Sequence, residues 1–160
     1  MKKATLPIAP KEDFLRLDRQ LCFPLYAASR LVTRLYQPLL EPLGLTYPQY
    51  VVLLILWESS PCSVSHIGER ALLNSNTLTP LLKRLEYLGY VRRTRSAADE
   101  RVVEISLTAV GAALKARCAC VPERLFASVK YPPEKAAVLK ELLDELLLNL
   151  HSTPEIDAIV

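Results

Sequence analysis

A cysteine and two tyrosines near the start of the chain share one helical face. Cys22 lies in the stretch Q-L-C-F-P-L-Y-A-A-S-R-L-V-T-R-L-Y, which also holds Tyr26 and Tyr36. At about 100° per residue, both tyrosines lie within roughly 40° of the cysteine around an ideal helix. Phenol hydroxyls that donate to sulfur stabilise a thiolate, the reactive form of cysteine. A small buried cysteine among core aromatics fits the same spacing, and the spacing alone favours that simpler interpretation.

Cys22 and Tyr36 cannot touch within one continuous helix. Their separation along the axis would be about 21 Å at 1.5 Å per residue. They could meet across a two-fold dimer in which leucine-rich terminal helices cross. Pro24 falls inside the helical pattern of residues 14–40, so we expect a kink there or a helix break near Gln20. Such a break would bring helix-terminal amides close to Cys22.

Two short helical segments and a hairpin follow in the middle of the chain. Apolar periodicity predicts helices at residues 66–72 and 75–88. Alternating arms at residues 90–95 and 101–107 flank the polar turn 96–100 and predict a β-hairpin. Helix, helix and hairpin in this order are typical of a winged helix-turn-helix, a DNA-binding unit.

Capping residues mark where these helices start. Thr46 is a plausible cap for the apolar helix that precedes the unit, and Ser65 for the first short helix. Either Asn74 or Ser75 caps the second short helix. A short edge strand is expected at residues 63–64. These signals place the start of each helix within a residue or two.

The second short helix has an apolar face and a polar face. The apolar face comprises Leu78, Leu81, Leu82, Leu85 and Leu88. The candidate DNA-contacting residues are Ser75, Asn76, Thr77, Thr79, Lys83 and Arg84. Short hydrogen-bonding side chains at the amino end, with basic ones further on, suit a helix whose start enters the major groove. An ordinary solvated face has the same pattern, and the helix alone favours that reading.

The predicted hairpin carries an unusual density of arginine. The chain has a net charge of +3, and residues 83–101 alone hold six basic and three acidic side chains. The basic residues of the hairpin are Arg92, Arg93, Arg95 and Arg101. A wing that lies along phosphates, with one arginine in the minor groove, requires this density. Asp99 could hold the Arg101 guanidinium in a bidentate pairing. RNA is less favoured, because no aromatic stacking platform is present.

Long helices are predicted on the carboxyl side as well, at residues 108–127 and 134–150. The 160-residue chain is 51% hydrophobic, and its surplus leucine lies mostly at the two ends. Such a surplus indicates helix contacts between chains. We therefore predict a mainly α protein. Residues 1–45 and 108–160 would form a helical dimerisation region, and residues 46–107 a winged helix-turn-helix DNA-binding domain.

Several function classes find no support in the sequence. No apolar run approaches the ~18 residues that span a bilayer, and no secretory signal opens the chain, so we expect a cytoplasmic protein without membrane contact. The four cysteines lack the paired spacing of a zinc site, and a reducing compartment favours a redox role over a structural one. No catalytic triad, paired-carboxylate or phosphate-loop pattern appears. We expect no enzyme activity, cofactor or metal.

Four stretches resemble the MarR family of winged-helix repressors, in particular its organic-hydroperoxide-sensing OhrR branch. They read Q-L-C-F-x-L-Y-A-A-S-R, Y-x-P-L-L-E-P-L-G-L-T-Y-P-Q-Y, L-T-P-L-L-K-R-L-E and D-E-R-V-V-x-I-S-L-T. The resemblance covers roughly residues 15 to 125. The stretches around Cys22 and around Tyr47 to Tyr50 are specific to that branch.

The resemblance implies a homodimer that represses a peroxide-detoxification gene from a pseudo-palindromic operator in double-stranded DNA. An organic hydroperoxide would oxidise Cys22 to a sulfenic acid, and the derivative would release the DNA. Tyr36 and Tyr47 match the tyrosines that bond the reactive sulfur from the partner subunit. Tyr26 shares the face of Cys22, and Arg101 matches the wing arginine that enters the minor groove.

The sequence also departs from the family pattern. Members that form an intersubunit disulfide carry a resolving cysteine near residues 125–128, where this chain has none. Cys118 or Cys120 could resolve Cys22, but their offset of two residues directs them to different faces. Otherwise a low-molecular-weight thiol would serve. Asn76 replaces a usual glycine, and Pro24 replaces an unbranched or aliphatic residue.

Two other functions remain open from the residues. A repressor of the MarR type could release DNA on binding a small aromatic ligand, with Cys22 incidental. An apolar helical interaction module that does not read DNA is the third possibility. We rank the peroxide-sensing repressor first and the interaction module last.

Overall fold

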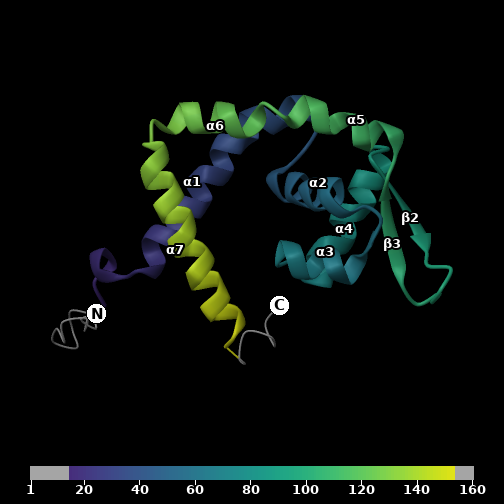
Figure 1. The fold of residues 1–160 in the computed structure, drawn as a ribbon, viewed down its shortest axis with the longest axis horizontal. Helices are drawn as coiled ribbons and strands as arrows, with labels where there is room; N and C mark the ends of the chain where they lie inside the picture. Colours follow the sequence, from purple (N-terminus) through teal and green to yellow (C-terminus); the bar gives the residue numbers. More distant parts are fainter. Residues whose placement is uncertain (1–14, 154–160) are drawn as a thin grey trace.

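The computed structural model describes residues 15–153 and forms an arch (Figure 1). The helices are α1 (Cys22–Leu40), α2 (Tyr47–Ser59), α3 (Val64–Ala71), α4 (Ser75–Tyr87), α5 (Ala109–Cys118), α6 (Val121–Val129) and α7 (Pro133–His151). Short 3-10 turns lie at η2 (Leu17–Arg19) and η3 (Glu41–Leu43), and the strands are β1 (Cys62–Ser63), β2 (Val91–Arg95) and β3 (Val103–Leu107). Residues 1–14 and 154–160 of the predicted dimerisation region lie outside the described residues.

A winged helix-turn-helix forms one side of the arch, as predicted (Figure 1). Its sheet has the order β1-β3-β2, with both pairs antiparallel. Val91 pairs with Leu107 and Arg95 with Val103, which fixes the register of the hairpin. Val91 and Ile105 are buried, so this face of the sheet packs on the helices, while Arg92, Arg95 and Arg101 are exposed.

Helix α2 is the centre of the core. Its buried residues are Gln49, Tyr50, Val52, Leu53, Ile55 and Leu56. From α4, the buried leucines are Leu78, Leu82 and Leu85. Burying one such aliphatic side chain contributes about 1.5–3 kcal/mol. The predicted apolar face of α4 is confirmed, and it leaves the opposite face of this helix free for another surface.

Local capping explains the helix starts. Thr46 and Gln49 form a reciprocal capping box at α2. Asn74 caps α4 through its side-chain oxygen, which accepts from the Thr77 amide at 3.0 Å. The expected cap Ser65 is wrong, because the Ser63 hydroxyl oxygen accepts from the His66 amide at 3.1 Å and α3 begins at Val64. The chain therefore passes directly from β1 into α3.

Two helix boundaries lie beside a proline, and one of them differs from the expected position. Helix α1 begins at Cys22, so the predicted break near Gln20 is confirmed, and Pro24 lies in the first turn where no amide donor is needed. The long helix expected at residues 108–127 is divided into α5 and α6. Pro122 lies in the first turn of α6, where its ring and missing amide stop the preceding helix.

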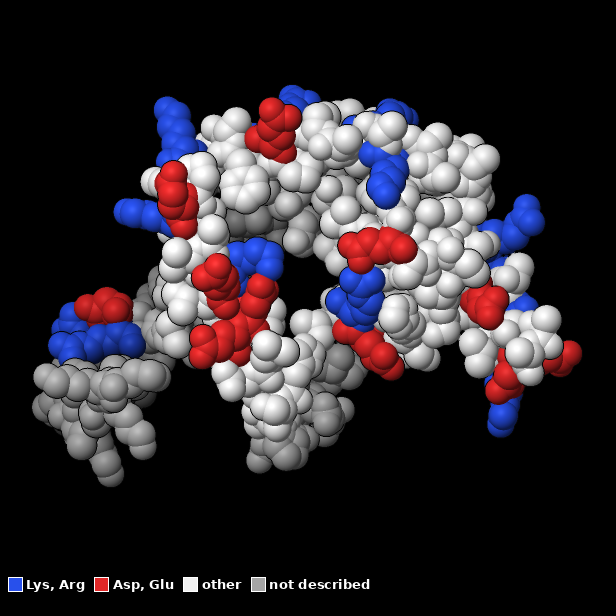
Figure 2. All heavy atoms as spheres, viewed as in Figure 1, with Lys and Arg blue, Asp and Glu red and all other residues white. Residues whose placement is uncertain are grey.

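The helical arm of the arch exposes much apolar surface. Helix α7 has no buried residue among those described. Exposed apolar residues of the arm include Leu21, Phe23, Leu31, Leu35, Phe126, Val138, Leu142 and Leu148. Figure 2 shows an open gap between this arm and the winged unit. Within residues 15–153 no single helix is long and apolar enough to cross a membrane, although α1–η3 and α2, bent by 74°, pass that test as a pair.

Gly111 allows α5 to pack directly against the backbone of Tyr90, the residue that precedes β2. A Cβ atom at this position would lie 1.9 Å from the Tyr90 carbonyl oxygen. We expect Gly111→Ala to lower the free energy of unfolding by about 2–3 kcal/mol, since the backbone must shift to remove the overlap. Urea denaturation at fixed protein concentration measures this loss.

Ala112→Ser is the matched control for that substitution, because Ala112 is exposed on the same helix. It should change the unfolding free energy by less than about 0.5 kcal/mol. Equal urea midpoints for Gly111→Ala and the control would contradict the close backbone contact.

Candidate redox centre and nucleic-acid interface

Three tyrosines form a cluster where α1 and α2 meet. The ring centroids of Tyr36 and Tyr47 lie 4.7 Å apart, and those of Tyr36 and Tyr50 lie 5.8 Å apart. Tyr36 belongs to the last turns of α1, whereas the other two lie in the first turn of α2. The short turn η3 folds the chain back between them. Two residues that the sequence assigned to one site are thus side by side.

Burial raises the pKa of two of these phenols, Tyr36 and Tyr50. It raises the pKa of Tyr36, and the neighbouring Tyr47 phenol raises it further. Burial, aided by Tyr36, raises the pKa of Tyr50 to about 12. A phenol whose pKa lies above its ordinary value remains an O–H donor at neutral pH. The cluster can therefore donate hydrogen bonds to an anionic sulfur or oxygen.

Cys22 lies at the opposite end of the same helix. It is the first residue of α1, it is exposed, and α1 runs unbroken from it past Tyr36. The separation along the axis is about 21 Å for fourteen residues. Tyr26 is 58% exposed, with the Arg30 guanidinium carbon 5.6 Å from the centroid of its ring. Within one chain, the structure does not bring Cys22 to Tyr36 and Tyr47.

A cavity of about 450 Å³ adjoins the tyrosine cluster between α1 and α2. Its polar lining residues are Thr33, Arg34, Gln37, Glu41, Thr46 and Tyr47. It has room for a few side chains or a small molecule. Since Tyr47 lines it and contacts Tyr36, a group that entered this cavity would reach the tyrosine pair.

Cys118 and Cys120 lie on different faces, as their spacing predicts. Cys118 is 2% exposed at the end of α5, and burial raises the pKa of its thiol. Cys120 is exposed between α5 and α6. Cys62 is partly buried in β1, and burial raises its thiol pKa as well. Of the two possible resolving cysteines, only Cys120 faces solvent.

The candidate DNA residues of α4 lie on its outer side. Ser75, Asn76 and Thr77 form its first turn and are exposed. Thr79 is half-buried, while Lys83 and Arg84 are exposed further along. The Arg84 guanidinium carbon lies 5.1 Å from the ring centroid of Tyr87. A helix that starts with short polar side chains and continues with basic ones fits a major groove.

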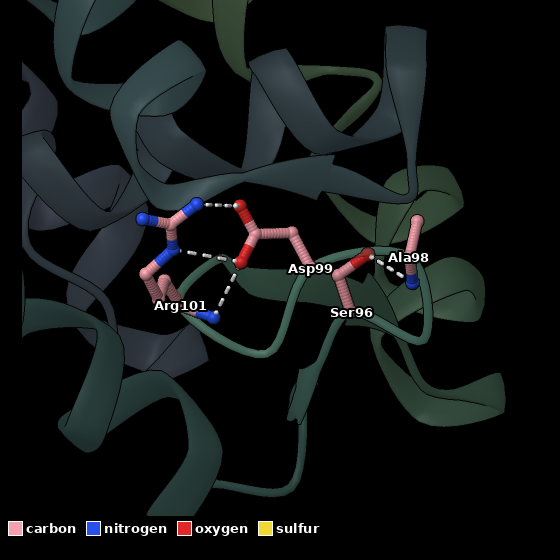
Figure 3. Close-up of polar contacts among 4 residues, drawn as sticks. All are labelled: Ser96, Ala98, Asp99 and Arg101. Atoms are coloured by element: carbon pink, nitrogen blue, oxygen red, sulfur yellow. Dashed lines mark hydrogen bonds and ion pairs between the residues drawn. The ribbon is translucent and has the colours of Figure 1, made fainter.

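The tip of the hairpin holds Arg101 in a fixed orientation (Figure 3). The Asp99 carboxylate accepts from Nε and Nη2 of Arg101 at 3.1 and 3.2 Å, and from its backbone amide at 3.0 Å. These bonds lower the pKa of Asp99 below its ordinary value. The Arg101 side chain is nevertheless 91% exposed. The predicted bidentate pairing is present, and it orients the guanidinium outward.

Other hairpin residues complete this surface. Charged side chains of both signs gather at the tip (Figure 2). Arg92 and Arg95 are exposed and Arg93 is half-buried. The Arg93 amide donates to Glu86 of α4 at 3.1 Å, which ties the wing to the reading helix. The Nε of Arg93 is buried and has no hydrogen-bond partner among the described residues.

The third member of the tyrosine cluster, Tyr50, and the link between α4 and the wing were not predicted from the sequence. Tyr50 lies three residues after Tyr47, so helical spacing alone placed both on one side of α2. The contact between Glu86 and Arg93 joins residues of different elements, and no local spacing reveals it.

The two carboxyl-side cysteines should differ sharply in reactivity. In the Cys22→Ser, Cys62→Ser background, we expect one thiol to react rapidly with a maleimide. The second should react only as the protein unfolds in urea, because Cys118 is buried and its raised pKa leaves less thiolate. Mass spectrometry of peptides should place the rapid label on Cys120. Equal labelling of both under native conditions would contradict the burial of Cys118.

The chain is similar in sequence to known transcriptional regulators. The family model of the transcriptional regulator SarA/Rot matches residues 34–117. The organic hydroperoxide resistance transcriptional regulator of Bacillus subtilis is 48% identical over 141 residues, which cover 88% of this chain and 96% of that protein.

Solved structures show the same architecture. Reduced AbfR bound to DNA is 40% identical, with a TM-score of 0.71 over 89% of this chain and all of that one. Disulfide-formed AbfR is also 40% identical, with a TM-score of 0.56 over 86% of this chain and 96% of that one. The winged-helix fold described above agrees with these matches. The chain belongs to the MarR-type winged-helix transcriptional regulators, in the branch of the organic hydroperoxide resistance regulators.

Proposed function

We propose that this DNA-binding regulator senses organic hydroperoxides through Cys22 and releases its operator when that cysteine is oxidised. The observation that carries the proposal is the contact between Tyr36 and Tyr47 at one end of α1, with Cys22 exposed at the other end of the same unbroken helix. A cysteine and a donor pair that cannot meet within one chain can meet between two chains.

A two-fold dimer would supply the missing contact. The described arm exposes apolar residues along α1 and α7, and only contact with another surface removes them from water. Residues 1–45 and 108–160 would form this dimerisation region. Crossed α1 helices would place Cys22 of one subunit beside Tyr36 and Tyr47 of the other. The cavity beside Tyr47 offers the entry for that cysteine and for the peroxide.

The chemistry follows from the donors in this site. The Cys22 thiolate attacks the terminal oxygen of the hydroperoxide, the O–O bond breaks, and an S–O bond forms. The products are a sulfenic acid and an alkoxide, which takes up a proton to become an alcohol. Phenol O–H groups of the tyrosine pair stabilise both the thiolate and the developing alkoxide. The sulfenic acid then condenses with a thiol, either Cys120 or a low-molecular-weight thiol, to give a disulfide and water.

The DNA interface consists of α4 and the wing. In a dimer the two α4 helices would lie near one DNA turn apart, about 34 Å, and would read a pseudo-palindromic operator in double-stranded DNA. The first turn of α4 would meet base edges, while Lys83, Arg84 and Arg95 would meet phosphates. Arg101 would enter the minor groove. The Nε of Arg93 has no partner among residues 15–153, and a phosphate oxygen would satisfy it if the half-buried side chain turned outward on DNA.

The cavity also favours a second candidate function. A space of about 450 Å³ lined by Arg34 and Tyr47 could hold a small aromatic ligand between α1 and α2. The regulator would then be released by that ligand, and Cys22 would be incidental. If a small ligand still releases the DNA from Cys22→Ser, this second function is favoured over the first.

The Asp99–Arg101 pair generates a prediction for DNA binding. Arg101→Ala should weaken operator binding by about tenfold or more, the loss of one groove contact. Asp99→Asn should weaken it about threefold, because the guanidinium loses its orientation. The double variant should bind no worse than Arg101→Ala alone. Fluorescence anisotropy at fixed salt measures all three.

Glu100→Gln is the control for charge, since it removes one negative charge beside the same pair. It should leave binding unchanged or slightly stronger. If Asp99→Asn behaved like Glu100→Gln, the orienting role of Asp99 would be wrong.

Peroxide response generates a further prediction. Cumene hydroperoxide, added with a small thiol, should release the operator from the wild type, and Cys22→Ser should remain bound. Cys120→Ser is the matched cysteine control. Release from it only when the small thiol is present would identify Cys120 as the internal resolving thiol. A wild type that keeps its operator after Cys22 is shown by mass spectrometry to be oxidised would contradict the proposed function.

A further inference from the structure

The tyrosine cluster continues through the core to the far end of α2. Tyr50 is 2% exposed, and its ring meets the ring of Trp57 edge-on with centroids 6.3 Å apart. Both residues lie on α2, two turns apart. Tyr50 therefore contacts Tyr36 on one side and Trp57 on the other, and close packing prevents it from moving independently of either.

Trp57 connects α2 to the start of α5. Its Nε1 donates to the Gly111 carbonyl oxygen at 2.9 Å. Gly111 lies against the Tyr90 carbonyl so closely that a Cβ atom would lie 1.9 Å from that oxygen. The contact between α5 and the residue before β2 is thus one of backbone with backbone. A displacement of α5 must displace the base of the hairpin.

Tyr90 closes the path back to the sensor helix. Its hydroxyl donates to the Leu43 carbonyl oxygen at 3.1 Å, in the turn η3 that directly follows α1. Its own carbonyl oxygen accepts from the Thr108 amide at 3.1 Å, at the start of α5. Tyr90, on one side of the hairpin base, is therefore bonded both to the turn that follows the sensor helix and to Thr108 on the other side of that base.

We propose that Tyr36, Tyr50, Trp57, Gly111, Tyr90 and Leu43 form a ring of contacts, closed by the chain between Tyr36 and Leu43, that sets the orientation of the wing relative to α1. Tyr90 and Trp57 are its positioning residues. The ring rests on the proposed function, because its input is the displacement of Tyr36 by an oxidised Cys22. Its output is a rotation of the hairpin that carries Arg101 away from the position that fits the minor groove.

The ring transmits displacement because its links are short and directional. The aromatic links are packed on buried Tyr50, and close-packed contacts of this kind do not compress. The two hydrogen bonds hold their partners only within narrow ranges of distance and angle. A shift at Tyr36 must therefore be passed on or must break a link. Either result changes the balance between two arrangements of the winged unit on the sensor helix.

Trp57 is the single tryptophan of the chain and reports on the ring directly. In the absence of DNA, oxidation by cumene hydroperoxide with a small thiol should change the Trp57 emission spectrum of the wild type. Cys22→Ser should show no change. Unchanged emission in a wild type whose Cys22 is oxidised and whose operator is released would overturn the ring, because the hairpin would have moved without it.

Conservative variants test whether the ring carries the response. Tyr90→Phe removes one hydroxyl, and Trp57→Phe removes one N–H donor while keeping a ring. The measured quantity is the ratio of operator dissociation constants in the oxidised and reduced states. Each variant should lower this ratio about fivefold, the effect expected from one lost hydrogen bond. The rate of Cys22 oxidation should stay at the wild-type value.

Tyr131→Phe is the matched control, since Tyr131 lies between α6 and α7, outside the ring. It should keep the wild-type ratio. Melting temperatures separate coupling from stability. If Tyr90→Phe is less stable but keeps the wild-type ratio, its role is structural and the ring is overturned. Failure of the wild type itself to release DNA on oxidation would instead contradict the proposed function, so the two failures are distinguishable.

Discussion

The unbroken helix α1 is the constraint on which the rest of the arrangement depends. A rigid helix holds its two ends at a fixed distance, and here one end carries an exposed thiol and the other a pair of half-buried phenols. The separation of about 21 Å cannot be closed by side-chain motion. Only a chain reversal in the middle of α1 would bring both groups together within one chain. Pro24 lies in the first turn of α1, where it breaks no internal hydrogen bond. The helix therefore continues without a break from Cys22 past Tyr36 and keeps the thiol apart from the phenols.

The two sides of the arch differ in how they are stabilised. The winged unit has its own core around α2, with leucines of α4 and Ile105 of the sheet fully buried. The arm has almost none, since α7 buries no residue and α1 buries only Leu40. An arm that depends on a second chain for its stability can change position when the contact between chains changes. This division suits a protein in which chemistry between subunits alters the spacing of two reading helices.

Much of this could be predicted from the sequence, because the strongest signals are local. The apolar face of α4, the hairpin with its arginines, and the break before Cys22 all follow from spacing and from proline. The pairing of Asp99 with Arg101 followed from a separation of two residues. The division of the carboxyl-side helix was missed although Pro122 was visible, because helical periodicity continues across the break. Ser63 was not predicted as the cap of α3 because the same residue is also the last residue of strand β1.

Contacts between distant elements could not be predicted. The links of Trp57 to Gly111 and of Tyr90 to Leu43 join residues about fifty positions apart, and nothing in either local stretch indicates its partner. The proximity of Cys118 to Tyr50 could not be predicted either. The spacing of Cys118 and Cys120 therefore predicted that they lie on different faces, but it did not predict which of them is buried. Helical spacing identifies a shared face. Only the fold shows what that face meets.

A heterodimer tests the shared redox site most directly. One subunit carries Cys22→Ser, and the other carries Tyr36→Phe with Tyr47→Phe, so the only remaining Cys22 lies on the chain without the two phenols. A site shared between subunits pairs this cysteine with the intact tyrosines of its partner, and its oxidation by cumene hydroperoxide should proceed at the wild-type rate. Oxidation at the slower rate of the Tyr36→Phe, Tyr47→Phe homodimer would show that the tyrosines act within their own chain, and it would contradict the shared site.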